Sequence, residues 1–248
     1  TGGHGSDAVD GVSLEVRAGE ILGVAGVAGN GQDELVETIT GLRQPRSGTI
    51  LLDGEDVTGH SPRDLHGKNL AYVPADRHRF GLVLSFPLTD NTVLTDYYME
   101  PYSHGVIRDE GAIAKRADEA IAQYDVRTPA ATVTAGTLSG GNQQKLIVAR
   151  EFDRDIKLLV LDQPTRGLDV GSIEYIHKQV IRKRDAGTAV LLVSAELDEV
   201  LEISDRIAVM YRGRIVAVVD GRTANKEEVG LLMATGGREG GAGGETAS

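Results

Sequence analysis

The feature that most constrains the fold is a glycine-rich turn followed, one short helix later, by a buried strand. The turn is Leu138-Ser139-Gly140-Gly141-Asn142-Gln143, and the strand is Leu158-Leu159-Val160-Leu161, which ends at Asp162. A Ser-Gly-Gly turn that opens a helix presents free backbone N–H groups, a hydroxyl and the positive end of the helix dipole, all of which suit a phosphate group. The pair of features therefore predicts a phosphate-binding α/β protein.

A second glycine-rich loop lies earlier, between an apolar strand at 21–24 and a helix that stops at Gly41. Strand, glycine-rich loop and helix in this order are the context of a P-loop. The loop departs from the G-x-x-x-x-G-K-[ST] pattern, because Gln32 stands at the lysine place and Asp33 at the hydroxyl place. Losing the lysine removes a charge-assisted contact of about 1.5–3 kcal/mol, so we expect weaker nucleotide binding. The candidate nucleotide-binding residues are Gly26, Gly29, Asn30, Gly31, Gln32 and Asp33.

Together these motifs resemble the ATP-binding domains of ABC transporters. In that resemblance 138–143 is the signature motif, 158–162 is the Walker B strand and 167–169 is the D-loop. The longer forms LSGGNQQK and QPTRGLDVG are similar to the second, C-terminal nucleotide-binding half of bacterial nucleoside and simple-sugar importers. The resemblance implies an α/β fold with a P-loop NTPase core, a mostly parallel sheet, an antiparallel β flap and an inserted helical subdomain. It also implies ATP and Mg²⁺ as cofactors.

Four positions that act on ATP bound to the same chain have lost their chemistry, when judged by this resemblance. They are Gln32, Ala75, Gln163 and Ala195, at the places of the P-loop lysine, the Q-loop glutamine, the catalytic glutamate and the switch histidine. A glutamine can hold a water but cannot take its proton, and such base assistance contributes about 10²–10⁴ in rate. Asp162 is kept and, together with Asp33, is the candidate ligand for Mg²⁺.

The signature motif is complete, and in ABC dimers it acts on ATP held by the other domain. Its residues are Ser139, Gly140, Gly141, Asn142 and Gln143, with Asp169 on the D-loop. The resemblance therefore predicts the degenerate half of an importer ATPase, whose signature loop completes the site of its partner. Expected partners are a second nucleotide-binding domain upstream in the same polypeptide, transmembrane permease subunits and, indirectly, an extracellular substrate-binding protein. The expected location is the cytoplasmic face of the cell membrane.

Two other enzymes remain open: a self-sufficient ABC ATPase homodimer, and a soluble ABC ATPase of DNA repair or translation. A module that binds no nucleotide is a third alternative. The net charge of −11 disfavours a nucleic-acid partner, and the absence of cysteine excludes thiolate metal sites. No apolar stretch approaches the roughly 20 residues of a membrane span, so a transport role needs separate membrane subunits.

The chain divides into four predicted regions: 1–85 with the β flap and P-loop, 86–136 as the helical insert, 137–235 with the remaining core, and 236–248 as a disordered tail. Alternating apolar residues at Val12, Leu14 and Val16 predict a strand. The basic segment 76–82 is expected to be a solvated loop, with contact to a coupling helix of a membrane subunit as the alternative. Tyr97, Tyr98, Tyr102 and Phe86 gather in the insert, which makes it the candidate contact with membrane subunits; ordinary packing of a small subdomain is the alternative.

Overall fold

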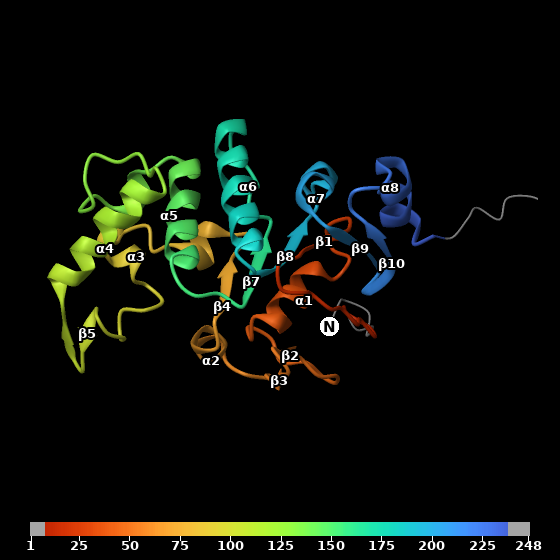
Figure 1. Ribbon diagram of the computed structural model, residues 1–248, viewed down its shortest axis with the longest axis horizontal. Helices are drawn as coiled ribbons and strands as arrows, with labels where there is room; N and C mark the ends of the chain where they lie inside the picture. The colour runs from red at the N-terminus through yellow and green to blue at the C-terminus, as the bar shows by residue number, and fades with distance from the viewer. Residues whose placement is uncertain (1–7, 238–248) are drawn as a thin grey trace, which may run out of the picture.

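A computed structural model describes residues 8–237, and its centre is a six-stranded sheet (Figure 1). The strand order is β10-β9-β1-β8-β7-β4, and every neighbouring pair is parallel except β9 with β10. The carboxyl ends of the parallel strands therefore meet at one edge, where ligands bind in open α/β sheets. The strands are β1 Ile21–Ala25, β4 Leu70–Val73, β7 Leu158–Asp162, β8 Ala189–Ser194, β9 Arg206–Tyr211 and β10 Arg214–Asp220.

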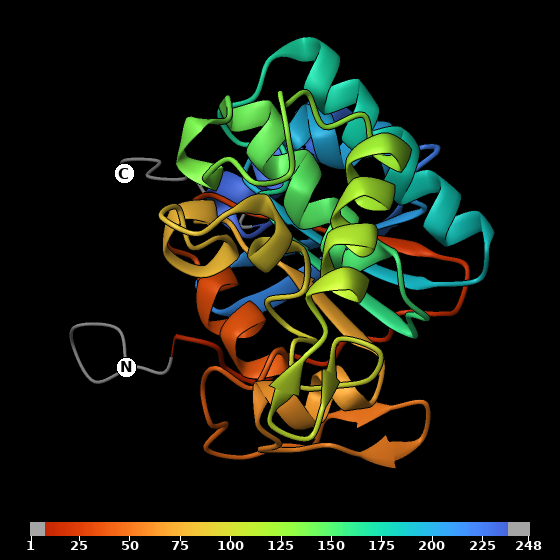
Figure 2. The same ribbon diagram turned by 90° about the vertical axis from the view of Figure 1, so that its left-hand side faces the viewer.

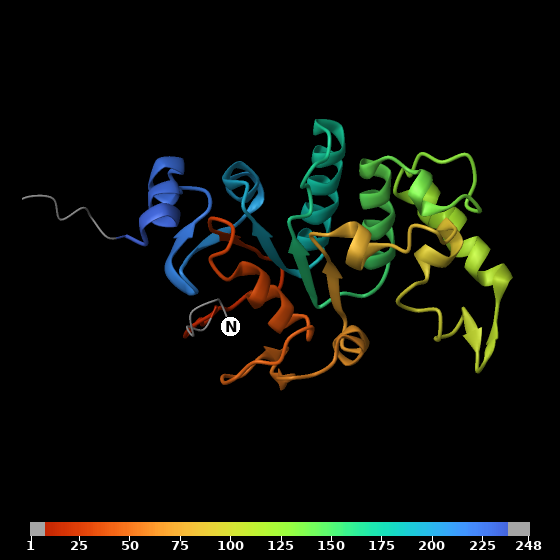
Figure 3. The same cartoon turned by 180° about the vertical axis from the view of Figure 1, so that it is seen from behind.

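Helices cover both faces of this sheet, which explains why its inner strands are continuously apolar rather than alternating. Along β8, Val190 and Leu192 pack into the cluster beneath α5 and α6, whereas Leu191 and Val193 pack into the cluster beneath α1. Figures 1 and 3 show α5 to α8 above the sheet and α1 below it. The covering helices are α1 Gln32–Ile39, α5 Gly140–Phe152, α6 Val170–Asp185, α7 Leu197–Ile203 and α8 Lys226–Thr235.

Two smaller units extend from the sheet. The first is a hairpin of β2 Leu51–Leu52 and β3 Glu55–Asp56, followed by α2 Pro62–Gly67, which begins at the capping box of Ser61 and Asp64. The second lies between β4 and α5 and faces the viewer in Figure 2. It contains α3 Leu88–Thr92, a hairpin of β5 Ser103–His104 and β6 Ile107–Arg108, α4 Glu110–Gln123 and the 3₁₀ turn η2 Ala135–Thr137. Its two ends are joined by the hydrogen bond from the Ala135 N–H to the Phe86 carbonyl, at 3.0 Å.

This architecture confirms the predicted fold class. The predicted strand around Val12, Leu14 and Val16 is wrong: within the described part of the chain, residues 12–16 form no strand and belong to no sheet. Their apolar alternation has another cause, because all three side chains are partly buried against the cluster beneath α1. Gly236 ends α8 in the left-handed conformation, and the predicted disorder of the tail lies, from residue 238 onward, outside the described residues. None of the helices within 8–237 is long and apolar enough to cross a membrane.

Candidate functional site

The glycine-rich loop joins β1 to α1 at the carboxyl edge of the sheet, as expected for a P-loop. Gly29 and Gly31 adopt φ of 87° and 103°, a left-handed conformation that favours glycine. The Gln32 side chain is buried and turns back into the loop. Its Nε2 donates to the Val27 carbonyl at 3.1 Å, and its Oε1 accepts from the Asn30 N–H at 3.0 Å. The amide at the lysine place therefore bonds to the loop from inside, and the Asn30 N–H that it accepts also donates to the Val27 carbonyl at 3.2 Å.

Asp162 ends β7 beside this loop, with 6 % of its surface exposed. Burial raises the pKa of its carboxyl to about 6, the charge of Asp33 adds to that rise, and hydrogen bonds from the Ala75 N–H and the Tyr72 hydroxyl oppose it. Asp162 Oδ1 is buried without a hydrogen-bond partner. A buried carboxylate oxygen without a donor is costly unless a cation is nearby, so the pair Asp162 and Asp33 fits one divalent ion. No group of three or more possible metal ligands lies together anywhere in residues 8–237.

Tyr72, on β4, is the first aromatic residue of the chain and faces Asp162. Its side chain hydrogen bonds to Asp162, and burial raises the pKa of its hydroxyl. Ala75, at the Q-loop place, offers Asp162 only its backbone N–H. Neither contact was predicted from the sequence, because a tyrosine in a strand belongs to no recognised motif and the Q-loop pattern concerns a side chain, whereas Ala75 acts through its backbone N–H.

Gln163 and Ala195 lie together at the ends of β7 and β8. Gln163 has φ of 48° and donates its N–H to the Val193 carbonyl at 2.8 Å. Its side-chain Oε1 accepts the Ala195 N–H at 3.2 Å. The structure thus brings the catalytic-glutamate place and the switch place into contact, but neither side chain can accept a proton from water.

The signature motif lies at the N-terminus of α5. Ser139 is the N-cap of this 13-residue helix and accepts the Asn142 N–H at 3.4 Å and Asn142 Nδ2 at 3.0 Å. Gln143 is buried and donates to the Ala135 carbonyl at 3.2 Å. The first turn of α5 carries no acidic side chain, so its free N–H groups and dipole offer a positive end to an anion.

The D-loop aspartate lies beside this motif. Asp169 is the N-cap of α6: it accepts the Ser172 N–H at 3.0 Å and the Ser172 hydroxyl at 2.7 Å, and these bonds hold its pKa below the usual range. A Cβ at Gly141 would lie 2.3 Å from Ser172 Oγ and 3.3 Å from Asp169 Oδ2. Gly141 is therefore required for the close approach of α5 to α6.

Arg77 and His78, which lie next to the signature motif, belong to the segment for which the sequence predicted a solvated loop. Residues 77–81 instead form a short π-helical turn, η1 Arg77–Gly81, packed against α5. Arg77 Nη1 donates to the Arg166 carbonyl at 3.2 Å, and the His78 ring Nε2 lies 2.9 Å from Gln143 Oε1. The one sequence feature that could have suggested these contacts is that Arg77 and His78 follow the Q-loop place at Ala75 by two and three residues.

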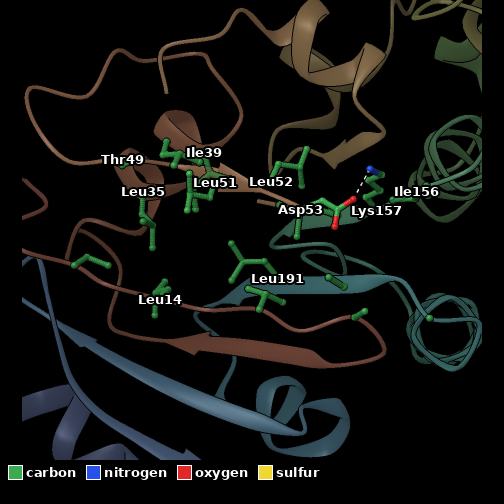
Figure 4. A pocket seen from close by; sticks show the side chains of 17 residues that line it. Leu14, Leu35, Ile39, Thr49, Leu51, Leu52, Asp53, Ile156, Lys157 and Leu191 are labelled. Atoms are coloured by element: carbon green, nitrogen blue, oxygen red, sulfur yellow. Dashed lines mark hydrogen bonds and ion pairs between the residues drawn. The ribbon is translucent and has the colours of Figure 1, made fainter. Parts of the chain in front are cut away.

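The predicted residues therefore form two separate groups. One contains the P-loop with Asp162, Gln163 and Ala195 at the carboxyl edge of the sheet, and the other contains the signature motif and Asp169 at the starts of α5 and α6. An apolar cavity of about 500 Å³ belongs to neither (Figure 4). It lies between α1, the β2–β3 hairpin and the amino ends of β7 and β8, and Lys157 pairs with Asp53 at its margin, 2.6 Å between Nζ and Oδ2.

Comparison of the sequence with known proteins identifies its family. Residues 9–166 match the family model described as ABC transporter. The chain is 51 % identical over 231 residues to the guanosine import ATP-binding protein NupO of Bacillus subtilis, covering 93 % of this chain and 45 % of that protein. It is 52 % identical over 233 residues to the nucleoside import ATP-binding protein NupA of Lactococcus lactis, covering 94 % and 46 %. The chain thus spans about half the length of these curated relatives.

Solved structures support the fold. A nucleotide-free ATP-binding cassette from an ABC transporter superposes with a TM-score of 0.75 at 23 % identity, covering 92 % of this chain and 89 % of that one. A dimeric bacterial ABC transporter cassette gives a TM-score of 0.73 at 22 % identity, covering 88 % and 92 %.

Proposed function

The chain belongs to the ABC transporter family of ATP-binding proteins, and we propose that it is the half of an importer ATPase that completes the ATP site of another domain. The transported molecule is a nucleoside or a simple sugar, by likeness to relatives named for guanosine, nucleoside and ribose import. The observation that carries the proposal is the contrast between the two groups of site residues. The group that acts on the chain's own ATP lacks its chemistry, whereas the signature group is complete and has open N–H groups.

The chain's own site retains a place for ATP and Mg²⁺ but not a means of rapid hydrolysis. Asp162 and Asp33 would hold the metal ion, which would neutralise charge on the phosphates when bound. The loop would offer backbone N–H groups, less the one that Gln32 already uses. Gln163, at the glutamate place, cannot take a proton from water, and its Oε1 already accepts the Ala195 N–H. ATP here would be a slow or structural ligand.

The signature group would act in trans. Ser139 Oγ and the N–H groups of Gly140 and Gly141 would bind the γ-phosphate of ATP held by the partner domain. Donors fixed before the reaction stabilise developing charge without reorganisation, and this is the main source of catalysis in phosphoryl transfer. Asp169 beside them would fix the contact between the two domains.

The partner domain would lie upstream in the same polypeptide, in keeping with relatives about twice the length of this chain. Permease subunits would dock in a groove of about 380 Å³ between α2, β4 and the segment after α3. Phe80 and Tyr97 line this groove and are about half exposed. Such a surface has the aromatic character of an interface centre. This docking would hold the chain at the cytoplasmic face of the membrane, and an extracellular substrate-binding protein would act through the permease.

Substitution in the assembled transporter tests the proposal. Ser139→Ala removes the hydroxyl, and Gly141→Asp blocks the α5 N-terminus with a carboxylate. Both should reduce ATP turnover by the complex at least tenfold, whereas Gln32→Ala should barely change it. Because a side chain at Gly141 meets Ser172, the thermal midpoint of each variant must be measured alongside. Equal effects of Ser139→Ala and Gln32→Ala would contradict the assignment and favour a homodimer with two equivalent sites.

A further inference from the structure

The Arg77 guanidinium lies on the backbone of the signature motif. A Cβ at Gly140 would come within 2.9 Å of Arg77 Nη2 and 3.5 Å of its Cζ. Gly140 is the first residue of α5, so the cation rests at the positive end of a 13-residue helix. The positive guanidinium and the positive end of the helix dipole repel each other unless an anion binds beside them.

The described part of the chain places no carboxylate in an ion pair with this cation. Among the ion pairs of residues 8–237, none includes Arg77. The neighbouring Asp76 caps the N–H groups of His78 and Arg79, and Asp169 is bound to Ser172. Of the guanidinium nitrogens, only Nη1 has a hydrogen-bond partner within the described part of the chain, and Nε is buried without one.

The turn η1, which carries Arg77, is nevertheless held firmly against α5. A Cβ at Gly81 would lie 2.5 Å from Ile147 Cδ1, so η1 is in close contact with α5. Arg150 Nη1 donates to the Gly81 carbonyl at 2.8 Å, and the His78 ring meets Gln143 one turn further along α5. Because the turn that carries it is already positioned, and its Nη1 is bound to the Arg166 carbonyl, Arg77 loses less entropy when an anion binds.

We propose that Arg77 is a phosphate-binding residue of the trans site, where its guanidinium contacts the γ-phosphate bound by the N–H groups of Gly140 and Gly141. This inference rests on the proposed function and adds a charged residue to it. Arginine suits this role because its planar fork matches phosphate oxygens and stays charged at every physiological pH. One guanidinium nitrogen, Nη1, donates to the Arg166 carbonyl, and the other, Nη2, lies beside Gly140 at the N-terminus of α5.

The experiment uses the full-length polypeptide assembled with its permease subunits. Arg77→Gln should lower kcat/KM for ATP at least tenfold, and Arg77→Lys should retain more activity because it keeps the charge. Arg222→Gln is the control: it removes an exposed arginine in the loop after β10 that pairs only with Asp220 among the ion pairs of residues 8–237, and it should leave turnover unchanged.

A second readout separates phosphate binding from a structural role. Arg77→Gln should weaken binding of a nonhydrolysable ATP analogue to the assembled protein but leave ADP binding unchanged, because ADP lacks the γ-phosphate. Equal loss of both affinities, or a thermal midpoint lowered relative to Arg222→Gln, would overturn the inference. Normal turnover by Arg77→Gln together with impaired Ser139→Ala would also overturn it, while the proposed function would stand. Normal turnover by both variants would refute both.

Discussion

The side-chain oxygen of Gln163 accepts a hydrogen bond from the backbone N–H of Ala195, with 3.2 Å between Oε1 and N. This bond joins the residue after Asp162 to the loop after β8, the two places from which a chain of this family would act on the attacking water. Both places are occupied by groups that cannot take a proton. This is the ground on which we propose that the chain's own site hydrolyses ATP slowly or not at all.

Restoring the P-loop should strengthen ATP binding by the isolated chain. We expect the double substitution Gln32→Lys with Asp33→Ser to lower the Kd for ATP about 10- to 100-fold, because a charge-assisted contact to phosphate returns and a repelling carboxylate leaves. Titration calorimetry measures the change. Gln163→Glu is the control, since it lies at the end of β7 rather than in the phosphate loop. An unchanged Kd in the double variant would show that the loop conformation, not the lost lysine, limits binding.

Asp162 should make stability depend on pH when no metal is present. Its folded pKa of about 6 lies above its unfolded value, so the folded state binds more protons and stability is lost as pH rises from about 4 to about 6. The loss is about 2–3 kcal/mol at pH 7. The Asp162→Asn variant lacks this titrating group. In EDTA, its free energy of unfolding should therefore equal that of the parent chain near pH 4 and exceed it by about 2–3 kcal/mol at pH 7. Urea unfolding at several pH values measures it, and an advantage that does not vary with pH would contradict the prediction.

A buried acid holds the loop after β7 against α6 and α7. Glu199 Oε1 accepts the Thr165 hydroxyl at 2.7 Å and lies 3.1 Å from His177 Nε2, and all three residues are buried. Glu199→Ala should lower the free energy of unfolding by about 2–4 kcal/mol, because two polar groups lose their partner. Glu202, which also faces His177 but is exposed, is the matched control. Equal effects of Glu199→Ala and Glu202→Ala in chemical denaturation would refute the buried role.

The groove beside the insert should be a contact for membrane subunits. Tyr97 is 51 % exposed and meets the Tyr98 ring edge-on at 5.5 Å between centroids. Tyr97→Ala should weaken co-purification with the permease without lowering the thermal midpoint, because little of the ring is buried in the free chain. Leu231→Ala on α8, also largely exposed, should change neither. Unimpaired assembly of the Tyr97 variant would exclude this groove as the docking site.

The sequence predicted the parallel sheet and the glycine-rich loops because both depend on local signals: apolar runs, and glycines between a strand and a helix. It failed at Val12, Leu14 and Val16, whose alternation reflects packing against α1 rather than strand pairing. It also misjudged Arg77 and His78, because their partners Arg166 and Gln143 lie 89 and 65 positions away. Contacts of that separation follow from the topology and leave no local pattern.

The most direct test of the central claim is ATP hydrolysis by this chain alone and then with its partner nucleotide-binding domain added. We predict no steady turnover alone and turnover on mixing, which Ser139→Ala in this chain then lowers at least tenfold. Steady hydrolysis by the chain alone, unaffected by Ser139→Ala in the mixture, would contradict the claim that it completes another domain's site.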